Sequence, residues 1–339
     1  MSQPPFAVTV CLCTHNPRPE YFPRVLAALA AQRLDPDHWE LLIIDNRSQP
    51  PVALGEGLPA PRHTRIVAEP ELGLTCARLR AIAEASGELI VFVDDDNVLA
   101  PDYLEEALRV MRERPSLGAI GGRCRGEFEE KPPVWSRPYL AYLAVAERAE
   151  SPKWNLHPNA YEPWYPCGAG LVIRRALARA YARELEKHPE RRQLDRRGDS
   201  LTSAGDIDML LTCMDQGTSI GTFPQLALVH LIPRERVRFD YLRRMIYHAN
   251  YSLYHLMLLR QSRFRPRRWP LAYLTCVGQG LLQGAWHPRA LLLAVEAARG
   301  RYAACRDFRK LKGTAKAGEG TPGEDFHCKG VRRKGKIIP

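Results

Sequence analysis

The stretch LIVFVDDD at residues 89–96 joins five consecutive apolar residues directly to three aspartates. Five apolar residues of this kind predict a buried central strand. The strand ends at Asp94, Asp95 and Asp96, and open α/β sheets bind ligands at the carboxyl edge of their strands. Three adjacent carboxylates repel one another, and a divalent cation relieves this repulsion because hard cations take oxygen ligands and bridge carboxylates to phosphates. The alternative interpretation is an acidic turn that binds nothing.

Segments typical of strands and helices alternate around this stretch. Strands are predicted at residues 8–13, 41–44, 65–67, 118–122, 170–173 and 226–229, and helices at 24–32, 75–85, 101–112, 239–260 and 270–299. This alternation predicts an α/β fold with a mostly parallel central sheet, flanking helices and a C-terminal helical extension. Residues 131–166, rich in Pro, Trp and Tyr, are expected to form a long ordered loop, and residues 180–200 an exposed, charged helix and turn.

The chain divides into four predicted parts. Residues 1–117 and 118–238 form two halves of one domain, and residues 239–311 form the helical extension. Residues 312–339 are expected to be a disordered basic tail, because Gly, Lys and Pro replace the residues that build a core.

Positive charge is concentrated in the second half of the chain. The net charge is +11, and ten arginines face two acidic residues between Arg234 and Arg268. Such patches suit phosphates, anionic lipid headgroups or nucleic acid. A nucleic-acid partner is not expected, because the aromatic side chains cluster at 131–166, away from the arginines. Basic, aromatic and apolar residues interleave over 234–293, which favours contact with a membrane surface; ordinary packing helices are the alternative.

Cysteine usage and the missing motifs exclude several classes of protein. The nine cysteines include no Cys-x-x-Cys pair, so zinc ribbons and thioredoxin-type redox motifs lack support. Their odd number, without a secretory signal, favours a cytoplasmic protein. No stretch reaches the ~18 apolar residues of a transmembrane helix. No Gly-x-Gly-x-x-Gly or Walker loop follows the first strand, which argues against a Rossmann dinucleotide site and a P-loop.

Polar residues stand at the ends of four predicted strands. Thr14 and Asn16 follow the first strand, Asp45 follows the second, and the three aspartates follow the strand at 89–93. His230 follows the last strand. Because the carboxyl ends of parallel strands share one edge of a sheet, we expect these side chains to converge despite their separation in sequence.

In their order and spacing, four segments of the chain resemble the family 2 glycosyltransferases. They read VTVCLCTHN at 8–16, LIIDNRS at 42–48, GLTCAR at 73–78 and GELIVFVDDD at 87–96. The resemblance covers roughly residues 7–245. It implies a GT-A fold, an inverting reaction and a nucleotide-diphospho-sugar donor, with the first half of the domain binding the donor and the second half binding the acceptor.

The resemblance implies roles for the strand-end residues. Nucleotide contacts fall on Thr14, Asn16, Asp45, Arg78, Asp94 and Asp95. Asp45 matches the acidic residue that receives the base N–H, usually of uracil, and a carboxylate suits this task because it only accepts hydrogen bonds. A turn-forming Asp45 is the alternative. Arg78 is expected to contact the base or Asp94, the alternative being a charge on the helix surface.

A divalent metal, Mn²⁺ or Mg²⁺, is the implied cofactor. Asp94 and Asp96 match the Asp-x-Asp motif of the family, with Asp96 as the direct ligand. Asp95 occupies the middle position, which varies in the family. His230 is the candidate third ligand, and a purely structural histidine is the alternative.

The catalytic base is implied by the segment AGDIDML at 204–210. Asp206 occupies the position of the base, which takes the proton of the acceptor hydroxyl as the oxygen attacks the anomeric carbon. Gly205 stands where Glu is common, and this departure keeps Asp208 open as the alternative base.

Two further segments border the acceptor and the diphosphate. Gly168, Ala169 and Gly170 precede a predicted strand, as the acceptor segment of the family does; a plain turn is the alternative. Arg234 and Arg236 lie in a loop suited to neutralising the departing diphosphate, or to forming surface salt bridges.

The expected function is transfer of a sugar from a UDP-sugar to a saccharide or lipid-linked hydroxyl acceptor. This activity fits polysaccharide or glycolipid biosynthesis for the cell envelope, at the cytoplasmic face of a membrane. The rival is a metal-dependent nucleotidyltransferase acting on sugar phosphates, which also uses paired aspartates but releases diphosphate.

Overall fold

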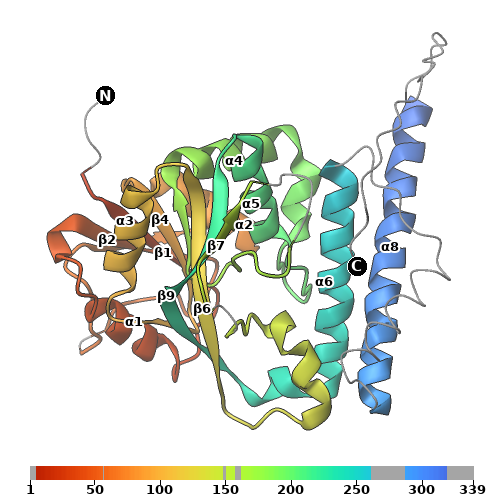
Figure 1. Ribbon diagram of the computed structural model, residues 1–339, viewed down its shortest axis with the longest axis horizontal. Coiled ribbons are helices and arrows are strands. Elements are labelled where there is room, and N and C mark those ends of the chain that lie inside the picture. The colour runs from red at the N-terminus through yellow and green to blue at the C-terminus, as the bar shows by residue number, and fades with distance from the viewer. Residues whose placement is uncertain (1–4, 56, 148–149, 157–161, 261–286, 319–339) are drawn as a thin grey trace.

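The computed structural model describes residues 5–55, 57–147, 150–156, 162–260 and 287–318, with the backbone alone for 312–318. The elements are β1 (Val8–Thr14), α1 (Phe22–Ala30), η1 (Pro36–His38), β2 (Trp39–Asp45), β3 (Thr64–Ala68), α2 (Leu74–Glu84), β4 (Leu89–Asp94), β5 (Asn97–Leu99), α3 (Tyr103–Glu113), β6 (Leu117–Phe128), η2 (Val134–Leu143), β7 (Lys153–Asn155), β8 (Leu171–Arg174), α4 (Arg175–Lys187), η3 (Pro189–Leu194), α5 (Gly205–Asp215), β9 (Ser219–Ile232), η4 (Arg234–Val237), α6 (Phe239–Arg260) and α8 (Pro288–Gly318). Figure 1 shows a central sheet with helices on both faces, and α6 beside α8 at one end.

The sheet confirms the predicted α/β architecture. Its order in the described residues is β3-β2-β1-β4-β8-β6-β9-β5, with β7 added to β9. The first four strands are parallel, whereas β8 joins β4 and β6 in antiparallel pairing. In the register of β1, Thr14 lies opposite Asp45, and Cys13 lies opposite Asp94. The predicted strand ends therefore meet at one edge.

The strands are buried on both faces because their side chains alternate between two apolar cores. Val10 and Leu12 of β1 pack with α1 and α3, while Cys11 and Cys13 pack with residues of α2, α4 and α5. Successive side chains of a strand point to opposite faces, and a sheet covered by helices on both faces has strands that read as continuous apolar runs. The run at 89–93 owes its composition to this position.

The second half of the sheet brings a late strand to the aspartates. β5 pairs antiparallel with β9, and in this register Asn97 lies opposite His230. The backbone N–H of Leu231 also donates to the carbonyl oxygen of Asp96, at 2.8 Å. The pairing places His230 beside the aspartates.

The C-terminal helical extension is confirmed by α6 and α8, which pack against each other and against η2. The apolar side chains of this cluster include Tyr139, Ile232, Ile246 and Leu293. No described helix is long and apolar enough to cross a bilayer. Residues 261–286, which form part of the stretch predicted to contact a membrane, lie outside the described residues.

Three local expectations need correction. The region predicted as a loop over 131–166 contains the 3-10 helix η2 and the short strand β7. Helix α8 continues to Gly318, past the predicted start of the disordered tail at 312; residues 319–339 lie outside the described residues. Within the charged segment 180–200, Arg191 and Asp195 are buried, because each pairs with an opposite charge from another element.

Candidate active site

The three aspartates are fixed by contacts at the end of β4. Thr14 donates a hydrogen bond from Oγ1 to Oδ2 of Asp95. Asn97 donates from Nδ2 to Oδ1 of Asp96 at 2.9 Å, and its own Oδ1 accepts the backbone N–H of Asp94 at 3.2 Å. The structure thus brings Thr14 and the aspartates together, as the sequence predicts, and Asn97 is the side chain that orders the turn.

Asp96, His230 and Arg236 form a tight cluster. Oδ2 of Asp96 lies 3.3 Å from Nε2 of His230 and 2.9 Å from Nη1 of Arg236. Nη1 of Arg236 is also 3.2 Å from Nε2 of His230. Burial alone would raise the pKa of Asp96, but the charges of His230 and Arg236 outweigh it and lower that pKa well below the ordinary value. Asp96 is therefore an anionic group.

The other two aspartates, Asp94 and Asp95, have raised pKa values. Burial, with the charge of Asp96, raises the pKa of Asp95 to about 7. Burial also raises the pKa of Asp94, opposed by Arg78 and reinforced by Asp96. Burial and a neighbouring carboxylate oppose the ionisation of these two groups, and a bound cation would favour their charged forms. This is the electrostatic condition that a metal site needs.

The donor atoms fit a hard cation, although the side chains do not yet form a metal cage. Among the described residues, no three His, Cys, Asp or Glu side chains are grouped as a ready-made metal site. Nη1 of Arg236 already places positive charge between Asp96 and His230, so this position accepts a cation. The buried Nδ1 of His230 has no hydrogen-bond partner in the described part of the chain. Carboxylate oxygens are the ligands that Mg²⁺ and Mn²⁺ prefer.

Arg78 lies behind the aspartates, in the first turns of α2. Its Nη1 donates to Oδ2 of Asp195 at 2.9 Å, and its guanidinium lies over the ring of Phe92, 5.8 Å from the centroid. Burial alone would lower the pKa of Arg78, but Asp195, Asp94 and Asp206 outweigh it and raise that pKa. Arg78 is thus a buried cation among carboxylates, which excludes the helix-surface alternative. Asp195 was not predicted, because its only sequence signal is an acidic residue within a charged segment.

Asp206 lies in the first turn of α5 and is half-buried. Its Oδ2 accepts the backbone N–H of Gly168 at 2.7 Å, and its Oδ1 accepts the backbone N–H of Ile207 at 2.8 Å. Burial raises the pKa of Asp206 above the ordinary value, opposed by Arg78. Asp206 and Asp94 both act electrostatically on Arg78 and on the thiol of Cys167, so they border the same region.

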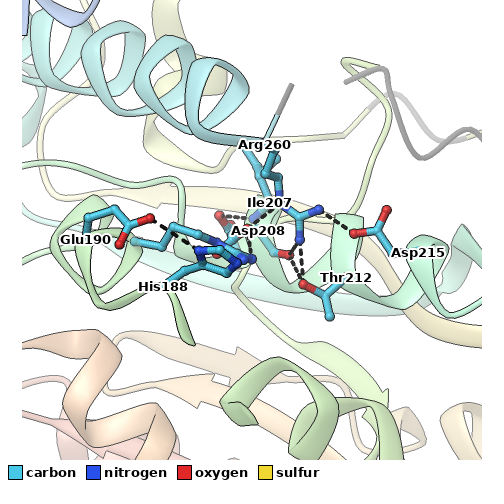
Figure 2. A network of polar contacts seen from close by, with 9 residues as sticks. His188, Glu190, Ile207, Asp208, Thr212, Asp215 and Arg260 are labelled. Atoms are coloured by element: carbon cyan, nitrogen blue, oxygen red, sulfur yellow. Dashed lines mark hydrogen bonds and ion pairs between the residues drawn. The ribbon is translucent and has the colours of Figure 1, made fainter. Parts of the chain in front are cut away.

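Asp208, the alternative base, faces a different environment (Figure 2). It is 0% exposed, and Arg191 donates to its Oδ2 from Nε at 2.9 Å and to its Oδ1 from Nη2 at 2.6 Å. Arg260 adds a bond from Nε to Oδ1 at 2.5 Å and another to Oδ2 of Asp215 at 2.6 Å. A carboxylate enclosed by two guanidinium groups has no access to an acceptor hydroxyl, so the geometry argues against Asp208 as the base.

Asp45 shows the turn-forming contacts that were its alternative interpretation. Its Oδ1 accepts the backbone N–H of Ser48 and its Oδ2 accepts that of Val52, both at 2.9 Å. Burial alone would raise the pKa of Asp45, but these hydrogen bonds lower it. Asn16, with φ at 53°, secures the same loop, accepting from the N–H of Gln49 at 2.7 Å. Contact of Asp45 with a nucleotide base stays a prediction.

The three residues of the predicted acceptor segment, 168–170, lie in different environments. Gly168 touches the site, because a Cβ there would lie 2.6 Å from Nη2 of Arg78. Ala169, by contrast, is buried in the apolar core, and its place beside an acceptor stays a prediction. Gly170 has φ at +72°, and a Cβ there would lie 2.5 Å from Oη of Tyr103, so a turn with this close packing requires glycine.

The two arginines of η4 also differ. Arg236 points to Asp96. Arg234 is exposed, and its backbone N–H donates to Oε2 of Glu129 at 3.1 Å. Glu235 between them pairs with Arg18. The structure therefore brings one predicted diphosphate arginine into the acidic cluster and leaves the other at the surface.

Comparison with known proteins identifies the family of the chain. The family model for glycosyl transferase family 2 matches residues 9–181. The O-antigen biosynthesis protein RfbC of Myxococcus xanthus is 32% identical over 116 residues; the match covers 33% of this chain and 9% of that much longer protein.

A solved structure supports the fold. The mannosyltransferase PcManGT from Pyrobaculum calidifontis, in complex with GDP-Man and Mn²⁺, superposes with a TM-score of 0.50 at 19% identity, covering 92% of this chain and 79% of that one. S. aureus TarS 1-349 in complex with UDP has a TM-score of 0.45 at 15% identity, covering 89% and 91%. The chain belongs to glycosyl transferase family 2 and is a glycosyltransferase with the GT-A fold.

Proposed function

We propose that this glycosyltransferase transfers a sugar with inversion from a nucleotide-diphospho-sugar to a hydroxyl acceptor, with Asp206 as general base. The arrangement of Asp206 carries this proposal. It is a half-buried carboxylate close to Arg78, because a Cβ on Gly168 would lie 3.3 Å from Oδ2 of Asp206 and 2.6 Å from Nη2 of Arg78. Like Asp94, it acts electrostatically on this guanidinium. The acceptor and the donor diphosphate would thus be bound on two sides of one buried cation.

Asp206 has the properties that a base needs. The backbone N–H groups of Gly168 and Ile207 fix its carboxylate, so its remaining lone pairs have a defined direction. Burial raises its pKa, which makes the carboxylate a stronger base. In an inverting displacement, this group removes the proton of the acceptor oxygen on the face opposite the leaving diphosphate. Such assistance typically contributes ~10²–10⁴ in rate.

Asp96 and Asp94, with His230, would hold a divalent cation, for which the donor set and its unbalanced charge are suited. When bound, the cation supplies Lewis-acid stabilisation of the diphosphate. Arg236 provides positive charge at the same place. Its guanidinium would leave Asp96 and contact the diphosphate of the donor. Thr14 fixes Asp95, which keeps the turn in register.

The identity of the donor rests on two different observations. Asp45 matches a position that usually recognises uracil, and this favours a UDP-sugar. The neighbouring mannosyltransferase was solved with GDP-Man, and both oxygens of Asp45 already bind backbone groups here. We therefore propose a nucleotide-diphospho-sugar donor, with UDP-sugars as the first class to test and GDP-sugars as the second.

The biological role is proposed from the relative in O-antigen biosynthesis. We infer that the product is a cell-surface polysaccharide or glycolipid, and that the acceptor is a saccharide or a lipid-linked saccharide. The arginines of η4 and α6 suit attraction to the anionic inner leaflet of a membrane, so we propose a cytoplasmic enzyme with peripheral membrane contact.

The test is a product assay with a panel of UDP- and GDP-sugars, with and without Mn²⁺. We expect metal-dependent release of a nucleoside diphosphate from one donor of the panel. Release of inorganic diphosphate instead would show a nucleotidyltransferase. The role of Asp206 is tested by the turnover of Asp206→Asn. Its control is Asp199→Asn, which removes an exposed carboxylate of the nearby loop and should keep wild-type turnover.

A further inference from the structure

Helix α5 begins at Gly205, and a carboxylate from another segment fills the space of its missing side chain. A Cβ placed on Gly205 would lie 2.4 Å from Oδ2 of Asp195 and 2.9 Å from its Cγ. Atoms this close cannot coexist, so Asp195 keeps its position only because residue 205 is glycine. The backbone of Gly205 is not in the left-handed region, and backbone conformation therefore does not require glycine there.

Asp195 is held rigidly in this space. Its Oδ1 accepts the backbone N–H of Arg196 at 3.0 Å, and its carbonyl oxygen accepts a hydrogen bond from Oγ1 of Thr202 at 2.7 Å. The N–H of Ala204 donates to the carbonyl oxygen of Leu194 at 2.9 Å, which closes the loop onto the start of α5. Asp195 is only 4% exposed. The loop presents one oxygen in one direction, toward Arg78.

From Asp195 a chain of close contacts leads to Asp206. Nη1 of Arg78 binds Oδ2 of Asp195 at 2.9 Å. Nη2 of the same guanidinium approaches Gly168 so closely that a Cβ would lie 2.6 Å away, and the N–H of Gly168 donates to Asp206 at 2.7 Å. Because a guanidinium is planar and rigid, fixing Nη1 also fixes Nη2. The position of Arg78 against the acceptor side thus depends on Asp195.

We propose that Asp195 is a positioning residue for sugar transfer, supplying Arg78 with the carboxylate that α5 lacks at Gly205. This inference rests on the proposed function of Asp206. Asp195 holds the guanidinium between the donor aspartate Asp94 and Asp206, so that Arg78 does not close directly onto either of them. A buried ion pair is by itself weak support for stability, because the cost of desolvation offsets the attraction. We therefore assign the ion pair between Asp195 and Arg78 to the positioning of the guanidinium.

The proposal predicts that the carboxylate can be moved from the loop to the helix. Asp195→Ala frees the space at Gly205, and the retained Cβ at 195 lies 3.2 Å from an added Cβ at 205, a contact that needs only a small shift. Gly205→Asp or Gly205→Glu then places a carboxylate on α5 beside Arg78. The same substitutions alone, with Asp195 present, create a clash and a second negative charge.

The experiment measures kcat and KM of the full chain for the donor of the UDP- and GDP-sugar panel that the wild type uses. It adds binding of UDP and GDP with Mn²⁺ by calorimetry, and thermal unfolding. Asp195→Asn and Asp195→Ala should lower kcat by about 10²-fold, the loss typical of a misplaced catalytic group. Nucleoside diphosphate binding and KM should change little. Gly205→Asp or Gly205→Glu in the Asp195→Ala background should recover most of the lost kcat.

Glu127→Gln is the matched control, because it removes a carboxylate from an exposed arginine pair with Arg24. It should keep wild-type kcat. The inference is overturned if folded Asp195→Ala keeps wild-type kcat, or if both double variants fold and stay as inactive as Asp195→Ala while the wild type is active. A wild type that uses no donor of the panel and binds neither nucleotide would instead contradict the proposed function, and the inference with it.

Discussion

Two aspartates of one helical turn, Asp206 and Asp208, have opposite environments. Residues two apart on a helix do not share a face, and here one face of α5 meets the sheet edge while the other meets two arginines. Asp206 is half-buried and bound by backbone N–H groups. Asp208 is fully buried and bound by Arg191 and Arg260. An Asp-x-Asp pattern can therefore place a reactive carboxylate and a structural one side by side, and only their partners distinguish them.

The largest expected effect is on turnover and belongs to Asp206→Asn. The amide keeps the shape of the side chain but cannot take a proton, so kcat should fall by ~10²–10⁴. Binding of nucleoside diphosphate with Mn²⁺ should persist, because Asp206 does not touch the Asp96 cluster in the described contacts. Steady-state kinetics and calorimetry check these two outcomes. Near-normal turnover would show that another group is the base.

Asp208→Asn should reverse this pattern. The substitution removes the carboxylate that the buried Arg191 and Arg260 share. Breaking such a buried ion pair costs about 3–5 kcal/mol of folding free energy. Denaturant unfolding measures this loss. The folded fraction should keep turnover within a fewfold of wild type, since the contacts of Asp208 with described residues do not include the site. Stability equal to wild type would refute the structural role.

Arg236→Gln should affect metal binding more modestly. Its Nη1 occupies the position between Asp96 and His230, so a cation must displace a charge-assisted hydrogen bond there, which is worth about 1.5–3 kcal/mol. Without the guanidinium, Mn²⁺ affinity in the absence of nucleotide should rise about tenfold, as measured by electron paramagnetic resonance titration. Turnover should fall, because the diphosphate loses a positive partner. Unchanged or weaker Mn²⁺ binding would exclude this competition.

The smallest effect is expected for Asp215→Asn. Asp215 pairs with Arg260 at the exposed end of the Asp208 network, with 47% of its side chain exposed (Figure 2). Exposed ion pairs contribute about 0–1 kcal/mol, so thermal and denaturant unfolding should stay close to wild type. A loss as large as that of Asp208→Asn would mean that the network acts as one unit.

The sequence predicted those parts of the site that depend on strand ends. Thr14, Asp94, Asp95 and Asp96 meet because parallel strands in register end at one edge, and this follows from the order of apolar runs. His230 joins them through the pairing of β9 with β5. These are consequences of the backbone, for which the periodicity of apolar residues is a sufficient signal.

The parts that were missed depend on contacts between distant side chains. Asp195 and Arg191 lie in a segment so rich in charge that local composition predicts exposure. Both are buried because their partners come from other elements: Arg78 is 117 residues from Asp195, and Arg191 meets Asp208 on α5. Composition carries no information about such pairings.

The most direct test compares kcat of folded Asp206→Asn and folded Asp208→Asn at saturating donor in the presence of Mn²⁺. We expect the first variant to be at least ~10²-fold slower than the second, although the second is the less stable protein. Equal turnover of the two variants, or slower turnover of Asp208→Asn, would contradict Asp206 as the base. It would also contradict the assignment of a catalytic role to one face of α5 and a structural role to the other.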